Sequence, residues 1–165
     1  MRPIARIAVA ALLLGAAVAH ADPCKLTIES NDQMQFSARE LVVSPGCPQV
    51  EVTLRNVGKF PVKVMGHDWV LAKDSDMPAI VNAGLAAGPN HGYVPENDPR
   101  VIAATRLVGG GDSATVTFST EALVAGGRYS FFCTSPGHSA LMRGRFQLGE
   151  PGRLAQAAKP PARAE

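Results

Sequence analysis

The chain has 165 residues, of which 16 are Lys or Arg and 14 are Asp or Glu, and 46% of its residues are hydrophobic. Arg2 and Arg6 lie in an N-terminal segment that we expect to be removed, which leaves 14 basic and 14 acidic residues in the mature chain. A neutral chain of this length suits one domain with a hydrophobic core, and it gives no electrostatic argument for binding nucleic acid or an anionic membrane surface.

The N-terminal segment has the organisation of an export signal. Arg2 and Arg6 precede a continuous apolar run at 7–18, and small residues surround a cleavage site after Ala21. The run is shorter than the roughly 20 residues that a membrane-spanning helix needs, which disfavours a retained anchor. We therefore expect residues 1–21 to be a cleaved signal peptide and the mature protein to begin at Asp22.

The mature chain predicts a series of short strands. Apolar and polar residues alternate in 25–29, and Val50, Val52 and Leu54 alternate with polar neighbours. Further strands are expected at 62–64, 69–72, 101–107, 114–118, 128–132 and 143–148. Turn residues rich in Gly and Pro separate these segments. Short strands punctuated by turns, with few helices between them, favour an all-β sandwich or barrel.

One segment has helical periodicity instead. Residues 74–76 can cap a helix, Pro78 suits its first turn, and Gly88 suits its end. We expect this helix to pack outside the sandwich and cover the core, with a functional role as the less favoured alternative. An irregular loop follows it as far as Pro99.

The C-terminal segment has a different composition from the rest of the chain. Residues 150–165 are rich in Ala, Pro and Arg and offer almost nothing to bury, so we expect them to be disordered. The folded domain is therefore expected to span residues 22–149.

Three cysteines follow the signal segment, and an odd number in an exported protein implies one disulfide and one thiol with another use. Cys24 and Cys47 both lie in the first third of the chain and flank a strand-like stretch, so they are the expected pair. The oxidising side of the membrane permits this bond. Cys133 remains; a buried structural thiol is the plainest interpretation of it.

Two other potential metal ligands follow Cys133 in the spacing C-x4-H-x3-M, namely His138 and Met142. A further imidazole, His67, follows Gly66 far upstream. A soft thiolate, two imidazoles and a weak thioether form the ligand set of copper sites that pass single electrons. The presence of these further potential ligands argues against a purely structural role for Cys133. Because such a set leaves no open coordination position, it favours an electron carrier over an enzyme.

Other functions fit the residues less well. Zinc also accepts Cys and His, but it would be redox-silent in such a site. Copper storage or delivery usually relies on exchangeable, thioether-rich sites, whereas one thiolate with two imidazoles suggests retention of the metal. A copper oxidase or nitrite reductase would need further histidines, and the mature chain has only His67, His91 and His138. His91 stands outside the pattern, and we interpret it as a surface or structural residue.

These residues resemble the azurins, which are bacterial periplasmic cupredoxins. The resemblance runs through 64–71 (VMGHDWVL) and 133–142 (CTSPGHSALM), and the early cysteine pair and the helical segment also fit. It covers essentially the whole mature domain, and its second motif is highly specific. It implies a periplasmic Greek-key β-sandwich with an external helix. It also implies one copper held by His67, Cys133 and His138, with Met142 axial and the Gly66 carbonyl as a weaker axial group.

The resemblance further implies a docking surface. In azurins the edge of the C-terminal histidine ligand lies within an apolar patch near the surface. The matching positions here are Met34, Phe60, Val64, Met65, Leu85, Pro136, Gly137, Ala140 and Leu141, some of which could instead belong to the core. A small exposed apolar patch suits transient redox encounters. The implied partners are c-type cytochromes, nitrite reductase, or amine- and aldehyde-oxidising dehydrogenases, and a monomer is the expected state.

Three positions inside the domain depart from the azurin pattern, and the tail at 150–165 extends beyond its usual end. Ser135 replaces the usual Phe and places a hydroxyl near the thiolate. Asp68 replaces an Asn that steadies the two ligand-bearing loops, and an ionised carboxylate there would favour Cu(II) and lower the potential. Asn56 stands where azurins commonly carry a histidine that titrates near neutrality, so we expect a potential that depends little on pH.

Overall fold

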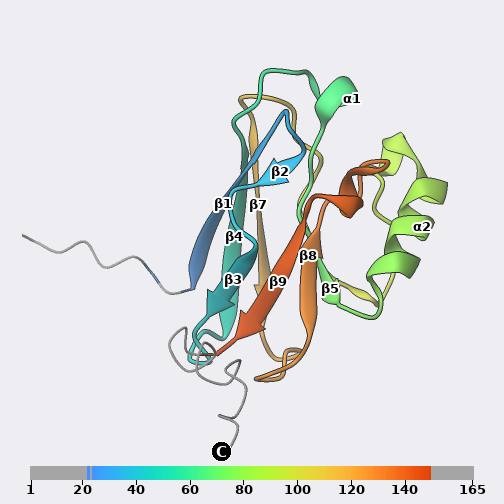
Figure 1. Ribbon diagram of the computed structural model, residues 1–165. Helices are drawn as coiled ribbons and strands as arrows, with labels where there is room; N and C mark the ends of the chain where they lie inside the picture. The colour runs from blue at the N-terminus through green and yellow to red at the C-terminus, as the bar shows by residue number, and fades with distance from the viewer. Residues whose placement is uncertain (1–21, 23, 150–165) are drawn as a thin grey trace, which may run out of the picture.

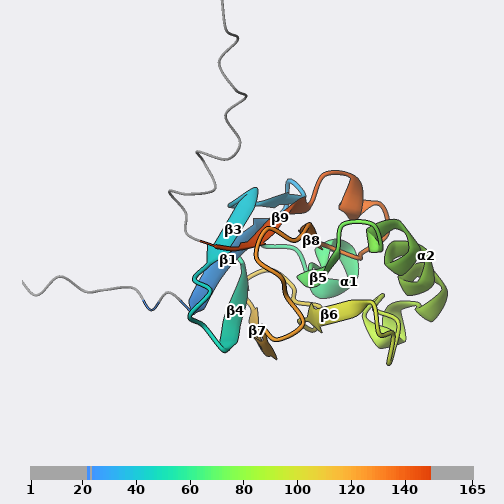
Figure 2. The ribbon, with the colours of Figure 1, turned by 90° about the horizontal axis from the view of Figure 1, so that it is seen from below.

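The computed structural model describes residue 22 and residues 24–149. The expected signal peptide at 1–21 and the expected disordered tail at 150–165 lie outside the described residues, so both stay predictions. The described part consists of two β-sheets packed face to face, with one longer helix on the outer face of the second sheet (Figures 1 and 2). This architecture confirms the predicted β-sandwich with an external helix.

The first sheet has four strands in the order β2-β1-β4-β7. These are β1 (Lys25–Asn31), β2 (Gln35–Phe36), β4 (Gln49–Asn56) and β7 (Ser113–Ser119). Strands β1 and β4 run parallel, whereas β7 is antiparallel to β4. In β4 the expected alternation is realised, because Val50, Val52 and Leu54 are completely buried and the residues between them are not.

The second sheet has five strands in the order β3-β9-β8-β5-β6. These are β3 (Glu40–Val43), β5 (Val70–Lys73), β6 (Val101–Ala104), β8 (Tyr129–Phe132) and β9 (Arg143–Leu148). All four residues of β8 are buried. Phe131 packs into the core between the sheets, while Phe132 packs on the opposite face against the external helix. Burial on both faces explains why this strand is apolar without alternation.

The external helix α2 (Met77–Ala87) has Pro78 in its first turn, and Gly88 ends it with a positive φ of 76°. Met77 and Ile80 are its buried apolar residues, and they pack against Val70, Ala72 and Phe132 of the sheet. The helix therefore packs outside the sandwich, as the sequence predicts, and the structure shows that it covers the outer face of β5 and β8. No helix among the described residues is long and apolar enough to span a membrane.

The predicted strand at 62–64 is wrong. These residues belong to the short helix α1 (Val62–Met65), in which the Pro61 carbonyl accepts hydrogen bonds from the N–H groups of Val64 and Met65. The alternation of apolar residues is typical of a strand with one buried face, but Val62 and Val64 are both exposed here. Pro61, with its fixed φ, starts a turn instead.

One predicted strand is much shorter than expected, and two short strands were not predicted. The predicted strand at 101–107 ends at Ala104, and Val108 forms an isolated bridge to His67 instead. Strands β2 and β3 were not predicted, because they are short and owe their extended state to pairing with β1 and β9. Cys24 and Cys47 form the expected disulfide, with Cα atoms 5.5 Å apart, and it joins the chain just before the neighbouring strands β1 and β4.

Candidate metal centre

The potential ligands come from two segments that meet at one end of the sandwich. His67 lies just before β5, where its backbone N–H and carbonyl pair with those of Val108. Cys133 follows the last residue of β8, and the loop from Cys133 to Met142 leads into β9. Figure 1 shows this orange-red loop at the end of β8 and β9, next to α2 and below α1. Adjacent strands therefore deliver the two segments to the same place.

The structure brings three of the predicted ligands together. The Cys133 Sγ lies 3.6 Å from His138 Nδ1 and 4.0 Å from His67 Nδ1, and all three residues are buried. A sulfur and a nitrogen bound to one metal at about 2.3 and 2.0 Å can lie no more than about 4.3 Å apart. Both distances satisfy this limit, so one metal ion fits between the three side chains.

A backbone carbonyl orients the first imidazole. His67 Nε2 lies 2.9 Å from the carbonyl oxygen of Asn31, at the end of β1, and can donate a hydrogen bond to it. A proton on Nε2 leaves the lone pair of Nδ1 facing Cys133, which is the tautomer that a ligand needs. The sequence gives no signal for Asn31, because any residue offers a carbonyl.

Both imidazoles favour their neutral form. Burial lowers the pKa of His67, helped by the positive charge of a protonated His138, while the Asn31 carbonyl and Asp32 act against this. Burial also lowers the pKa of His138. Since a histidine must be deprotonated to bind a metal, both side chains are ready to do so at neutral pH.

The thiol of Cys133 behaves differently. Burial, and then the negative charge of Asp68, raise its pKa well above its usual value, while the backbone N–H groups of Asp68 and Ser135 act in the opposite direction. A bound metal cation supplies the positive charge that a thiolate needs in such surroundings. The thiol therefore gains its negative charge together with the metal.

The loop that carries His138 and Met142 is closed by its own backbone. Gly137 has a left-handed φ of 81° and leads into the short 3-10 helix η2 (His138–Ala140). The Cys133 N–H donates to the Met142 carbonyl at 3.0 Å, and the Met142 N–H donates to the His138 carbonyl at 2.8 Å. Met142 is completely buried beside Cys133. The fourth predicted ligand thus lies on the same tight loop as the second and third.

Two side chains connect the ligand segments. Asp68 accepts hydrogen bonds from the backbone N–H and the hydroxyl of Thr134. The hydroxyl of Ser135 donates to the Gly66 carbonyl at 2.7 Å. The residues after His67 and Cys133 are thereby tied to each other. Sequence reasoning picked out Asp68 and Ser135 as departures, but it did not predict these partners.

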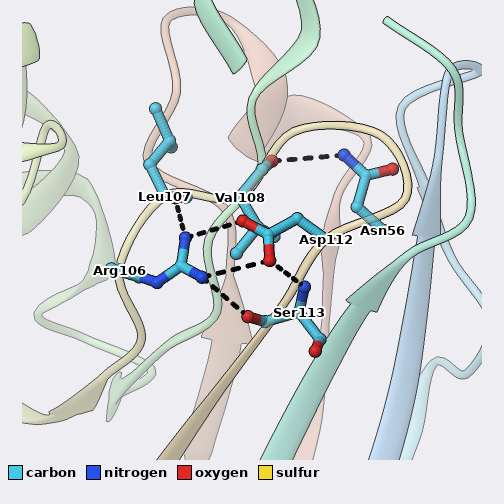
Figure 3. A network of polar contacts seen from close by, with 6 residues as sticks. All are labelled: Asn56, Arg106, Leu107, Val108, Asp112 and Ser113. Atoms are coloured by element: carbon cyan, nitrogen blue, oxygen red, sulfur yellow. Dashed lines mark hydrogen bonds and ion pairs between the residues drawn. The ribbon is translucent and has the colours of Figure 1, made fainter. Parts of the chain in front are cut away.

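The side-chain amide of Asn56 holds the backbone on either side of the first ligand segment. Its Nδ2 donates to the Val108 carbonyl at 3.2 Å (Figure 3). It also donates to the Met65 carbonyl at 3.4 Å, and its Oδ1 accepts from the N–H of Gly58 at 2.9 Å. Asn56 is 2% exposed. Because Val108 pairs with His67, this amide steadies the first ligand segment.

An ion pair between Arg106 and Asp112 lies next to Asn56. The Arg106 guanidinium contacts both carboxylate oxygens of Asp112 and also donates to the carbonyls of Leu107 and Ser113 (Figure 3). The Asp112 carbonyl accepts from the backbone N–H of Asn56 at 2.9 Å. The turn that leads into β7 is thus held against the end of β4.

Most of the positions expected in the docking patch are accessible. Phe60, Val64, Leu85, Pro136, Gly137, Ala140 and Leu141 are exposed, whereas Met34 and Met65 are half-buried. A groove between α1 and the Cys133 loop is lined in part by Val64, Pro136 and His138. His91 lies elsewhere, on the 3-10 helix η1 (Pro89–His91), where its Nδ1 is 2.9 Å from the Glu96 carboxylate.

A buried thiol flanked by two imidazole nitrogens at the end of a β-sandwich defines a type 1 copper site, which transfers single electrons. Residues 22–149 match the family model for copper-binding proteins of the plastocyanin/azurin family, and the chain belongs to that family.

The most informative relatives are bacterial azurins. Azurin-1 of Alcaligenes xylosoxydans is 48% identical over 125 residues, which cover 76% of this chain and 97% of the relative. The azurin of Bordetella pertussis is 47% identical over 125 residues, which cover 76% of this chain and 83% of the relative. The azurin of Pseudomonas aeruginosa is 43% identical over 148 residues, 90% of this chain and 99% of the relative. These similarities confirm the resemblance to azurins.

Proposed function

We propose that this chain, after removal of residues 1–21, is a periplasmic one-electron carrier that catalyses no reaction of its own. The observation that carries the proposal is the buried group of His67, Cys133 and His138, whose possible ligand atoms all lie within 4.8 Å of one another. Copper bound there supplies a Cu(I)/Cu(II) couple. His67, Cys133 and Met142 are completely buried, and with Met142 as a further ligand we expect no open coordination position for a substrate.

Each ligand has a proposed role. His67 Nδ1, Cys133 Sγ and His138 Nδ1 are the strong ligands, the Met142 sulfur is a weak axial ligand, and the Gly66 carbonyl is a weaker axial donor. The surrounding chain fixes these atoms before any metal binds, through the Asn31 carbonyl on His67 and the backbone bonds that close the Cys133 loop. Ligands held in this way need to move little when the charge of the site changes, which favours fast transfer.

Electrons are proposed to pass through the exposed edge of His138. This residue is 9% exposed and lies among the exposed loop residues Pro136, Gly137 and Leu141. A small apolar surface suits brief contacts with other redox proteins. We propose c-type cytochromes, nitrite reductase, or amine- and aldehyde-oxidising dehydrogenases as the partner classes, with the carrier acting as a monomer.

The test is to prepare the chain from Asp22 without metal, add Cu(II), and record optical and electron-paramagnetic spectra with and without ascorbate. We expect an intense blue thiolate-to-copper band and a narrow copper hyperfine splitting, both lost reversibly on reduction. The variant C133S should show neither, because it lacks the thiolate.

A pale or weakly held copper signal in the wild-type chain would contradict the proposed site. Rapid loss of copper to a chelator would favour storage or delivery of the metal instead. Mass spectrometry of the protein released from the periplasm should show a chain that begins at Asp22, and a longer chain would contradict the proposed export.

A further inference from the structure

Ser135 contacts both ligand segments at once. Its backbone N–H points toward the Cys133 sulfur and lowers the pKa of that thiol, while its hydroxyl donates to the Gly66 carbonyl at 2.7 Å. Ser135 is 5% exposed, so water competes little for this hydroxyl. One small residue therefore connects the proposed thiolate ligand with the carbonyl that directly precedes His67.

The Gly66 carbonyl has little freedom to avoid this bond. A Cβ on Gly66 would lie 2.4 Å from the Val62 carbonyl oxygen and 2.8 Å from Leu107, so the backbone here is packed too closely for any side chain. Gly66, Ser135 and His138 also line the same groove. The carbonyl, which directly precedes His67, thus keeps its hydrogen bond from the Ser135 hydroxyl.

A hydrogen bond to a carbonyl changes what the oxygen can offer a metal. The oxygen has two lone pairs, and the Ser135 proton engages one of them and offsets part of its negative charge. Carbonyl oxygens are hard donors that suit hard divalent cations, whereas thiolate and thioether select copper. A weakened carbonyl therefore matters more for Zn(II) than for Cu(I).

We propose that Ser135 is a positioning residue that holds the Gly66 carbonyl as a hydrogen-bond acceptor, weakens it as an axial donor, and so favours copper over harder cations and Cu(I) over Cu(II). This inference rests on the proposed function, in which Gly66 is the weaker axial donor. Ser135, which replaces the Phe usual in azurins, thereby affects both the choice of metal and the reduction potential.

Two matched pairs of proteins test the inference. The first pair is the wild-type chain and S135A, which lacks the hydroxyl. The second pair is S135T and S135V, which have nearly the same shape and also differ by one hydroxyl. Zn(II) and Cu(I) affinities of the metal-free proteins are measured by competition with chromophoric chelators, and thermal unfolding of the same samples checks the fold. S139A removes a half-buried hydroxyl from the same loop and serves as control.

We expect the ratio of Zn(II) to Cu(I) affinity to rise roughly three- to tenfold in S135A and S135V, the effect of losing one intramolecular hydrogen bond. S135T and S139A should keep the wild-type ratio, and the reduction potential should fall in S135A and S135V alone. If both affinities fall by the same factor, Ser135 has a merely structural role and the inference is wrong. Failure of the wild-type chain to form a blue site would instead refute the proposed function.

Discussion

Thr134 donates two hydrogen bonds to Asp68, one from its backbone N–H at 2.7 Å and one from its hydroxyl. Because Thr134 follows Cys133 and Asp68 follows His67, this pair fastens two proposed ligands to each other. Asp68 is completely buried, and burial raises its pKa to about 6 while the bonds from Thr134 lower it. The carboxylate is therefore mostly ionised at neutral pH.

The first prediction concerns this charge. D68N should raise the reduction potential by roughly 50–150 mV, since a negative charge several ångströms from the metal favours Cu(II) at an effective dielectric constant of about 20. The amide keeps both contacts, because its oxygen can accept from the Thr134 N–H and its nitrogen can donate to the Thr134 hydroxyl. Voltammetry at pH 7 measures the change.

The control for this variant is E121Q, which removes an exposed charge from the loop before β8, at the opposite end of that strand from Cys133. Its potential should stay at the wild-type value because solvent and salt screen a distant surface charge. An unchanged or lower potential in D68N would show that the Asp68 charge does not set the potential.

The second prediction concerns Asn56, whose amide holds the carbonyls of Val108 and Met65 behind His67. An amide does not titrate, so Asn56 itself should add no step to the reduction potential between about pH 5 and 8. The Asp68 carboxyl, with a pKa of about 6, titrates in this range, so the test uses the D68N background. N56H places a titratable group in the same position and should introduce a pH-dependent step. Voltammetry across this range compares D68N with D68N/N56H, and a clear sigmoidal shift in D68N would contradict the prediction.

The third prediction concerns the proposed docking patch. Leu141 is 52% exposed beside His138, and L141E should slow electron exchange with a c-type cytochrome at least roughly tenfold, because it buries a charge in a transient contact. Val124 is 67% exposed at the other end of β8, so V124E adds the same charge away from the patch. Stopped-flow rates that fall equally in both variants would argue against docking at this patch.

The fourth prediction concerns acid stability far from the metal. The hydrogen bond from Ser130, 2.7 Å from Asp74, is the main cause that lowers the pKa of Asp74 below its ordinary value of 3.8, with Arg128 adding to it. Because the folded pKa is the lower one, the stabilisation is present above about pH 4 and is lost as pH falls through the folded pKa.

Urea unfolding of the metal-free protein between about pH 5 and 2 tests this assignment. The free energy of unfolding should fall more steeply with acidification in the wild-type chain than in D74N or S130A. Parallel curves for the three proteins would show that Asp74 contributes no proton-linked stability.

The fifth prediction concerns the disulfide between Cys24 and Cys47, which are 23 residues apart. The double variant C24A/C47A should lose roughly 3 kcal/mol of unfolding free energy, because the unfolded chain regains the entropy of the opened loop. The disulfide lies at the start of β1, whereas Asn31, which contacts His67, lies at the opposite end of this strand. The blue copper spectrum should therefore stay unchanged. A loss of the blue band would reveal coupling between the two ends.

The sequence alone predicted most strands and picked out the candidate metal ligands, for different physical reasons. Strands such as β4 alternate in burial, and that alternation is written into the residues themselves. Copper chemistry restricts the ligands to few residue types, so Cys133, His138 and Met142 stand out by type and spacing. The segment 62–64 misled because its apolar residues lie on the surface, where alternation no longer reports a buried face.

Only the tertiary structure decided how these parts meet. The parallel pairing of β1 with β4 brings the Asn31 carbonyl to His67, and a backbone carbonyl leaves no trace in the sequence. The bond from Ser135 to Gly66 likewise joins residues 69 positions apart, through the pairing of β5 with β8. Residue types thus determined which metal the chain binds, whereas long-range strand pairing decided which groups surround it and tune its chemistry.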